Sequence, residues 1–244
     1  MVLGASLLPL LLVTLPLAIA SGADEYACPA YADLAEASVA ADEFDMSMLQ
    51  GIEWLMVATT EPTIPSFCEC TLLQYSVHKH DAAPGGWYNY SANTSCGFAG
   101  YRVRISAPLM GELSDDPRTP GLLHETFALF NHTVGQRDPN YIFRVEYDRS
   151  GGEIMAFHAY ACLGSPFGTS LFSYNFLVRR DFALAYNLDK QHVLEQVQAA
   201  NSKGLMAVDD DVVRIMDRSA WEKCGILTPV ASEGRSAIEP VVTV

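Results

Sequence analysis

The chain has 244 residues, of which 50% are hydrophobic and 18% are charged, and its formal net charge at pH 7 is -14. This length and apolar content fit one globular domain or at most two small ones. The acidity, with no block of basic residues, argues against nucleic acid as a partner, because nothing in the chain could neutralise a run of phosphates.

The first twenty residues are uncharged and leucine-rich, and they end in Ala18-Ile19-Ala20, a small-x-small pattern typical of a signal-peptidase site. We interpret residues 1–20 as a signal peptide and Ser21 as the mature N-terminus. An uncleaved membrane anchor is the alternative, but Pro9 and Pro16 interrupt the apolar run. No later segment is long and apolar enough to predict a transmembrane helix. We therefore expect secretion or residence in an endomembrane lumen.

Three glycosylation acceptor motifs agree with this route, and their asparagines are Asn89, Asn93 and Asn131. The six cysteines are Cys28, Cys68, Cys70, Cys96, Cys162 and Cys224. In an oxidising compartment they predict three disulfides, and their number alone leaves fifteen pairings open. The alternative is a metal site, but the only close pair, Cys68-Glu69-Cys70, lacks the usual Cys-x-x-Cys spacing.

Between residues 52 and 180 the sequence divides into short runs rich in Val, Ile, Tyr, Phe and Thr, which are typical of β-strands. Clusters of Gly, Pro, Asn and Asp separate them at 83–86, 114–121, 135–140, 149–152 and 164–168. No helical pattern intervenes, so antiparallel hairpins are expected rather than crossover units. The predicted strands are Ile52–Thr60, Glu69–Val77, Gly86–Tyr90, Gly97–Ala107, Leu122–Asn131, Tyr141–Tyr147, Ile154–Cys162 and Leu171–Arg180.

The last of these runs has apolar residues on both faces. Phe172, Tyr174 and Phe176 share one face, whereas Leu171 and Leu177 lie on the other. A sandwich with one wet face would alternate more cleanly, so the pattern favours a closed barrel whose outer wall is covered. The predicted fold is all-β with one C-terminal helix: an eight-stranded antiparallel up-and-down β-barrel.

A single strong helix follows the strands. Asn187 or Asp189 can cap its start, Val193, Leu194 and Val197 form an apolar stripe, and Gly204 lies where the helix should stop. The stripe must be buried, and the outer wall of the barrel is the surface available for it. The tail, residues 226–244, contains prolines and no periodicity, which predicts an unstructured segment.

A set of residues spread over most of the mature chain occurs in the order and spacing of a known family. They are Cys28-Pro29, Phe44-Asp45, Gly51, Trp54, Cys70, Tyr75-Ser76, Glu146-Tyr147, Tyr160, Cys162, Arg180 and Cys224-Gly225. Through these residues the chain resembles the lipocalin family, and most closely its apolipoprotein D-like branch. One departure is that two residues separate Gly51 from Trp54, where the family usually has one. The resemblance divides the mature chain into an N-terminal arm, 21–43, and a lipocalin-like barrel with its helix, 44–225.

The resemblance implies specific contacts that the spacing of the residues does not give. It implies disulfides Cys28–Cys162 and Cys70–Cys224, which leaves Cys68 and Cys96 as a further bridge. It also implies that Gly51, Trp54 and Arg180 close the base of the barrel, with Arg180 lying across the face of Trp54 in a cation–π contact.

A lipocalin-like calyx implies the binding and carrying of one small hydrophobic ligand, such as a lipid, sterol, retinoid, bilin or carotenoid, without a cofactor. Each candidate lining residue could equally serve as core packing. The candidates are Met56, Tyr75, Tyr101, Phe127, Phe143, Phe157 and Tyr174.

Two other functions stay open. The chain also resembles the lipocalin domain of violaxanthin de-epoxidase, which implies an enzyme that acts on an epoxy-carotenoid with ascorbate as co-substrate. That enzyme has paired aspartates before its sixth strand, whereas this chain has Asp138-Pro139-Asn140, so Asp138 is the only catalytic candidate and is expected beside a turn. The third possibility is an extracellular partner-binding module that uses the segments 79–95 and 108–121.

No metal site is predicted. His78 and His80 would share one face of a strand, but no third ligand can be named for them. The chain has no nucleophile elbow, phosphate loop or dinucleotide fingerprint.

Overall fold

The computed structural model describes residues 28–39, 44–61, 64–80, 87–98, 101–104, 109–113, 116, 118–129, 132–164, 170–206, 208, 212–227 and 241–243. The helices are α1 (Tyr31–Leu34), α2 (Lys190–Ala200) and α3 (Arg218–Lys223), with 3-10 turns η1 (Ala37–Val39), η2 (Met46–Leu49) and η3 (Arg180–Phe182). The strands are β1 (Glu53–Thr59), β2 (Cys70–His80), β3 (Trp87–Phe98), β4 (Tyr101–Arg104), β5 (Leu109–Leu113), β6 (Leu122–Leu129), β7 (His132–Tyr147), β8 (Ile154–Gly164), β9 (Ser170–Arg179), β10 (Arg214–Ile215) and β11 (Val241–Thr243).

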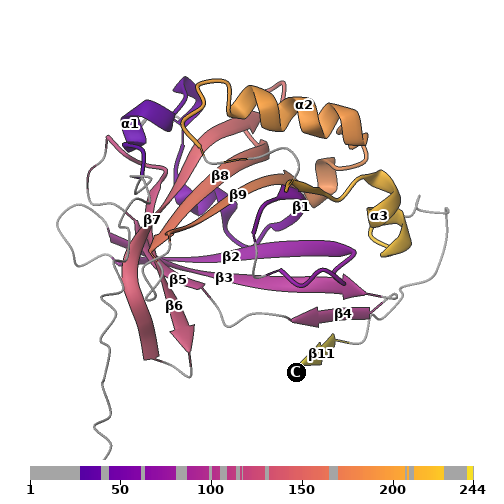
Figure 1. Cartoon of the computed structure of the whole chain (residues 1–244), viewed down its shortest axis with the longest axis horizontal. Coiled ribbons are helices and arrows are strands. Elements are labelled where there is room, and N and C mark those ends of the chain that lie inside the picture. Colours follow the sequence, from indigo (N-terminus) through magenta and orange to yellow (C-terminus); the bar gives the residue numbers. More distant parts are fainter. Residues whose placement is uncertain are drawn as a thin grey trace, which may run out of the picture.

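The strands close into a ring (Figure 1). Every neighbouring pair is antiparallel in the order β1, β2, β3, β5, β6, β7, β8 and β9, and β9 pairs back onto β1. β4 pairs with the last part of β3, while β5 pairs with an earlier part of it. The predicted eight-stranded up-and-down barrel is therefore confirmed, with its fourth strand interrupted between β4 and β5.

The predicted strand boundaries differ from the structure in three places. β3 continues through residues 91–96, which lie between the predicted strands Gly86–Tyr90 and Gly97–Ala107, and β5 was not predicted. Residues 135–140, expected to form a turn, lie inside β7. The pairing of β7 with β8 begins at Asn140, so Pro139 lies where β7 has only β6 as a neighbour. A proline is tolerated there because no second ladder requires its missing N–H.

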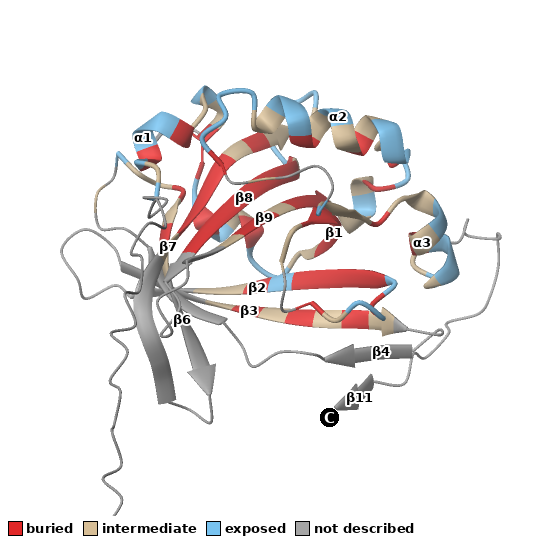
Figure 2. Ribbon diagram, in the orientation of Figure 1, coloured by how far each residue is buried: buried red, intermediate tan, exposed pale blue. Residues whose placement is uncertain are grey.

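The barrel wall is buried on both of its faces, and successive residues of a strand alternate between them. On the inner face Trp54, Phe157 and Leu177 belong to one apolar cluster. On the outer face Tyr160 and Phe176 belong to another cluster, which also contains α2 residues. Figure 2 shows buried positions along β1, β8 and β9 beneath α2. Because helix and wall bury the outer face together, both faces of these strands carry buried apolar residues.

Helix α2 occupies the expected position on the outer wall. Asp189 is its N-cap residue, and the Asn187 side chain accepts a hydrogen bond from the Asp189 N–H at 3.1 Å. Val193 and Val197 are buried against the wall, and Leu194 is half-buried. The chain ends the helix at Ala200, shortly before Gly204, so the predicted helix is confirmed. Helix α3 was not predicted.

Disulfides fasten both ends of the fold to the barrel. Cys28 is bonded to Cys162 in β8, and Cys224 after α3 is bonded to Cys70 in β2, with Cα atoms 5.9 and 6.6 Å apart. The third bridge joins Cys68 to Cys96. These are the pairs that the lipocalin resemblance implies.

The C-terminal segment contains regular structure that the sequence did not predict. Leu227 is buried and its N–H donates to the carbonyl of Trp221 at 3.4 Å. Val241–Thr243 form β11, which pairs in parallel with β4. The expectation of a wholly unstructured tail after residue 225 is therefore wrong for these residues.

Candidate functional site

One end of the barrel interior is filled by aromatic side chains. The Trp54 ring meets the Phe157 ring edge-on, with centroids 4.8 Å apart, and the Tyr75 ring lies 6.1 Å from Phe157. Trp54 and Phe157 are fully buried. Four residues of the arm and η2 pack against the same cluster: Val39, Phe44, Met46 and Leu49. Together they form a closed apolar floor, which we call the aromatic base.

Small and polar side chains line the inner face above this base. Strand register places Thr59 opposite Asn175, and Asn175 opposite Ala159, on the face that Phe157 occupies. One step further along the strands, Ser173 lies opposite Ala161. Asn140 is the other neighbour of Ala161 in the sheet. The described wall above the base thus carries amide, hydroxyl and methyl groups.

Some of these inner polar groups are joined by hydrogen bonds. The Thr59 hydroxyl donates to the Asn175 side-chain oxygen at 2.6 Å and accepts the Glu61 N–H at 2.9 Å. The Asn175 amide in turn donates to the Ser173 hydroxyl oxygen at 3.2 Å. We call Thr59, Ser173 and Asn175 the inner polar chain.

Three inner polar atoms that solvent does not reach have no hydrogen-bond partner among the described residues. They are Nε1 of Trp54, Oδ1 of Asn140 and Oγ1 of Thr71. Thr71 lies on the inner face of β2, two residues before Leu73, which is part of the inner cluster. A buried polar atom without a partner loses its hydration and gains nothing in return.

The seven predicted lining residues do not all share one face. Tyr75 and Phe157 meet in the aromatic base, and Met56 lies opposite inner residue Leu177 in the β1–β9 ladder. Phe143 and Tyr174 lie on the outer face instead, so the prediction that they line the cavity was wrong. A bulge in β7 between Ile142 and Arg144 turns Phe143 outward, and the hydrogen bond of Tyr174 with His158 holds it there. Tyr101 and Phe127 lie in β4 and β6, and their side chains are outside the described residues.

The outer face carries a buried polar network under the segment that leads into α2. Nδ1 of His158 lies 2.7 Å from the Tyr174 hydroxyl, and its Nε2 lies 3.5 Å from the Glu146 carboxylate. The Tyr186 hydroxyl donates to the other Glu146 oxygen at 2.7 Å. A neutral imidazole that carries its proton on Nε2 makes both contacts: Nε2 donates to Glu146, and Nδ1 accepts from the Tyr174 hydroxyl. We call His158, Glu146, Tyr174 and Tyr186 the outer network.

Burial and hydrogen bonding set the protonation states in this network. Burial lowers the pKa of His158, although Glu146 opposes the shift. Burial also favours the protonated form of Glu146, but the hydrogen bonds from His158 and Tyr186 outweigh it and lower the pKa of the carboxyl. The His158 ring additionally stacks on Phe176, with centroids 4.2 Å apart. The network is therefore held as a neutral histidine beside a carboxylate.

The base of the barrel is closed differently from the sequence prediction. Arg180 pairs with Glu53 instead of lying across Trp54. Glu53 and Trp54 are consecutive in β1 and point to opposite faces, which separates Arg180 from the indole. Arg179 is the residue opposite Trp54, and its guanidinium lies 5.1 Å from the centre of the Phe182 ring. Gly51 has a φ of 70°, a conformation that glycine adopts readily, and turns the chain into β1.

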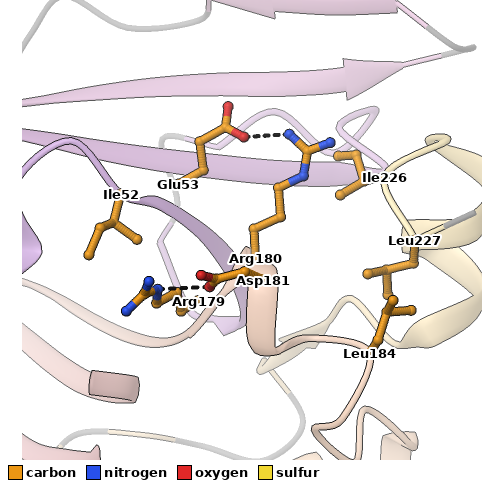
Figure 3. A pocket seen from close by; sticks show the side chains of 8 residues that line it. All are labelled: Ile52, Glu53, Arg179, Arg180, Asp181, Leu184, Ile226 and Leu227. Carbon is orange, nitrogen blue, oxygen red and sulfur yellow. Dashed lines mark hydrogen bonds and ion pairs between the residues drawn. The ribbon is translucent and has the colours of Figure 1, made fainter. Parts of the chain in front are cut away.

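An external pocket of about 410 Å³ lies beside this base (Figure 3). The ion pairs Glu53–Arg180 and Arg179–Asp181 cross it, as the dashed lines in Figure 3 show. Because each charge has a partner within the pocket, it offers no unpaired charge to a substrate. Its lining is Ile52, Glu53, Arg179, Arg180, Asp181, Leu184, Ile226 and Leu227.

The remaining predicted sites are described only in part. Asp138 lies within β7 opposite Glu125, not beside a turn as expected, and its side chain is outside the described residues. Asn93 is half-buried and lies opposite the exposed Gln74. Asn89 lies in β3, and Asn131 is outside the described residues.

In the part of the chain that the structure describes, no three His, Cys, Asp or Glu residues come together as metal ligands would. No helix within the described ranges has the length and apolar character needed to cross a membrane.

No family model matches the chain, and no curated protein matches it. Solved structures that resemble it include lobster apocrustacyanin A1, with 18% identity, 78% of this chain and 88% of that chain covered, and a TM-score of 0.43. Apocrustacyanin C1 has 17% identity, with 78% and 88% covered and a TM-score of 0.45. A bovine odorant-binding protein, a deswapped triple mutant, has 17% identity, with 69% and 93% covered and a TM-score of 0.39.

Proposed function

We propose that this protein binds and carries one small hydrophobic molecule inside its barrel. The observation that supports this most directly is the lining of the inner face, where an aromatic base is followed by Ala159 and Ala161 rather than by large side chains. An eight-stranded barrel is either filled by its own side chains or holds one small ligand. Methyl groups at two successive inner positions of β8 favour the second case.

The ligand classes follow from the lipocalin resemblance of the sequence: a lipid, sterol, retinoid, bilin or carotenoid. Tyr75 and Phe157 of the aromatic base would contact the apolar body of such a molecule, with Met56 and Leu177 beside them. Removal of apolar surface from water would supply most of the affinity.

We also propose that the protein acts outside the cytosol, in a secreted or endomembrane-lumenal form. All six cysteines are paired in disulfides, which persist in oxidising compartments. The signal-peptide interpretation of residues 1–20 and the acceptor motifs at Asn89, Asn93 and Asn131 agree with this route. A mass decrease on treatment with a glycosidase that removes N-linked glycans tests the proposal on protein from a secreting eukaryotic host.

The carrier proposal is tested by fluorescence titration with the neutral probe N-phenyl-1-naphthylamine. We expect saturable binding by the disulfide-intact protein. Ala161→Phe, which places a ring inside the barrel, should weaken it at least tenfold, about 1.4 kcal/mol. Gln74→Phe, which adds the same ring at an exposed position, is the matched control and should bind as the unaltered protein does. Equal binding by both variants would place the probe elsewhere and contradict the proposal.

A second assay separates carrying from catalysis. The protein is incubated with an epoxy-carotenoid and ascorbate at acidic pH, and the extracted pigment is identified. We expect the pigment to be recovered chemically unchanged. A de-epoxidised product would replace the carrier proposal with the enzyme alternative and make Asp138 the first residue to substitute.

A further inference from the structure

We propose that the Cys28–Cys162 bridge is an exchangeable disulfide, at which an external thiol attaches reversibly to Cys28. The bridge joins the N-terminal arm to the upper part of β8. Cys162 belongs to the outer apolar cluster, so the bridge lies outside the barrel. The modification site is therefore separate from the interior, and it does not depend on the proposed carrier function.

The three bridges differ in how far solvent reaches their sulfur atoms. Cys28 is exposed and Cys224 is half-buried. The other four cysteines have at most 1% of their surface exposed: Cys68, Cys70, Cys96 and Cys162. Thiol–disulfide exchange begins when a thiolate reaches one sulfur of the bridge, so its rate depends on access to that sulfur. Exposed bridges are the labile ones, and Cys28 supplies the exposed end here.

The Cys70–Cys224 bridge is protected by its packing, although Cys224 is half-buried. A Cβ atom placed on Gly97 of β3 would lie 3.1 Å from both sulfur atoms of the bridge, so the bridge packs directly on that strand. Sγ of Cys70 also lies 3.6 Å from the carbonyl oxygen of Ala220 in α3. Because a strand and a helix both contact this bridge, an incoming thiolate meets more obstruction there than at Cys28.

The arm has contacts beside Cys28 that do not require the bridge. The Tyr141 hydroxyl donates to the carbonyl oxygen of Pro29 at 2.9 Å. The Tyr31 hydroxyl accepts the N–H of Gly121 at 3.0 Å, and the rings of Tyr31 and Tyr141 are nearly parallel, with centroids 6.4 Å apart. These contacts hold the arm against β7 when the bridge opens. We therefore expect exchange to proceed without unfolding of the barrel.

The same contacts make the modification reversible. An incoming thiolate attacks Sγ of Cys28 and forms a new S–S bond with it. The Cys28–Cys162 bond breaks at the same time, and Cys162 leaves as a thiolate that takes a proton from water. One disulfide replaces another, so the step needs no oxidant. Because the arm keeps Cys28 close to β8, Cys162 can attack Cys28 in turn, expel the attached thiol and restore the bridge.

Limited reduction of the native protein tests the order in which the bridges open. The disulfide-intact chain is treated with dithiothreitol without denaturant, the reaction is quenched with acid, and free thiols are then labelled with N-ethylmaleimide in denaturant. We expect Cys28 and Cys162 to be labelled about tenfold faster than the other four cysteines, with an unchanged near-ultraviolet circular dichroism spectrum. Another bridge that opens as fast, or labelling that accompanies loss of this spectrum, would overturn the inference.

A matched pair of variants identifies the sulfur that is attacked. Cys162→Ala leaves Cys28 as a free thiol, and Cys28→Ala leaves Cys162 as one. Titrated with the neutral reagent 4,4′-dithiodipyridine, Cys28 should react about tenfold faster than Cys162. Equal rates, or faster reaction of Cys162, would contradict the assignment to Cys28.

The unaltered protein provides a measurement that does not depend on the folding of either variant. It is incubated with glutathione, quenched with acid and mapped by mass spectrometry. We expect a mixed disulfide that carries one glutathione on Cys28. An adduct on Cys162, or no adduct on Cys28, would overturn the inference.

Discussion

The two faces of the barrel wall differ in how completely their buried polar groups are hydrogen-bonded. On the outer face, both ring nitrogens of His158 and both oxygens of Glu146 have partners within the outer network. On the inner face the inner polar chain is hydrogen-bonded, but Asn140 and Thr71 each have an atom without a partner among the described residues. Networks of the first kind stabilise a fold, whereas atoms of the second kind are costly unless something binds them. The contrast separates a face whose described polar network is fully hydrogen-bonded from a face where the bonding is incomplete.

The largest expected effect comes from breaking the outer network. His158→Leu removes the partner of the Tyr174 hydroxyl and one partner of Glu146, all in a buried setting. We expect the free energy of unfolding to fall by about 3 kcal/mol, measured by urea denaturation. Lys190→Gln, at the exposed start of α2, is the control and should change it by less than about 0.5 kcal/mol. A loss of similar size in both variants would remove the distinction between network and surface.

The pH dependence of stability should report the same network. The pKa of His158 is lowered in the folded chain, so the unfolded chain takes up this proton first as the pH falls below about 6.5. Stability is therefore complete above that value and is lost below it, with a slope of at most about 1.4 kcal/mol per pH unit from this group. Glu146, whose pKa is also lowered, adds a second loss below about pH 4.5. Denaturation curves recorded between pH 7 and 5 should show the loss of stability that comes from His158. In the His158→Leu variant, the free energy of unfolding should depend less on pH over this range.

Two threonine variants compare a hydrogen-bonded hydroxyl with an unpartnered one on the inner face. Thr59→Val removes a hydroxyl that makes two hydrogen bonds and should lower the free energy of unfolding by about 1–2 kcal/mol. Thr71→Val removes a hydroxyl without a described partner, so the ligand-free protein should be unchanged or up to about 1 kcal/mol more stable. Thermal unfolding of the two variants measures the difference. A loss in Thr71→Val as large as in Thr59→Val would mean that the Thr71 hydroxyl is satisfied in the folded protein.

The smallest effect is expected at the base. Arg180 pairs with Glu53 at the surface, and such exposed pairs contribute about 0–1 kcal/mol. Arg180→Ala should therefore shift the melting temperature only slightly and leave probe binding unchanged. A loss well above 1 kcal/mol would point instead to the buried contact with Trp54 that the sequence suggested.

The barrel could be predicted from the sequence because the strand-forming runs and the turn residues between them are local features that repeat along the chain. The apolar residues on both faces of the run from Leu171 to Leu177 correctly indicated a wall covered from outside. The same pattern could not tell which face was which, because aromatic residues occupy both. Phe143 and Tyr174 were assigned to the wrong face for this reason, and the bulge in β7 left no trace in the residue pattern.

The candidate site was harder to predict than the fold. The sequence indicates only a turn at Asn140, because Asp138-Pro139-Asn140 has the composition of a turn. Its place inside β7 follows from the long pairing of β7 with β6, which depends on residues distant in the chain. Nothing in the sequence distinguishes Thr71 from other strand residues, because threonine is common in β-strands. The outer network joins β7, β8, β9 and Tyr186, so no local sequence pattern contains it.

The three disulfides share a topological property that sets how the molecule would respond to proteolysis. Cys28, Cys68 and Cys70 all precede residue 71, and their partners Cys162, Cys96 and Cys224 all follow residue 95. A single cut between residues 71 and 95 would therefore leave two polypeptides joined by every bridge in the protein. Such a nicked molecule would migrate as one two-chain species until a reductant is added.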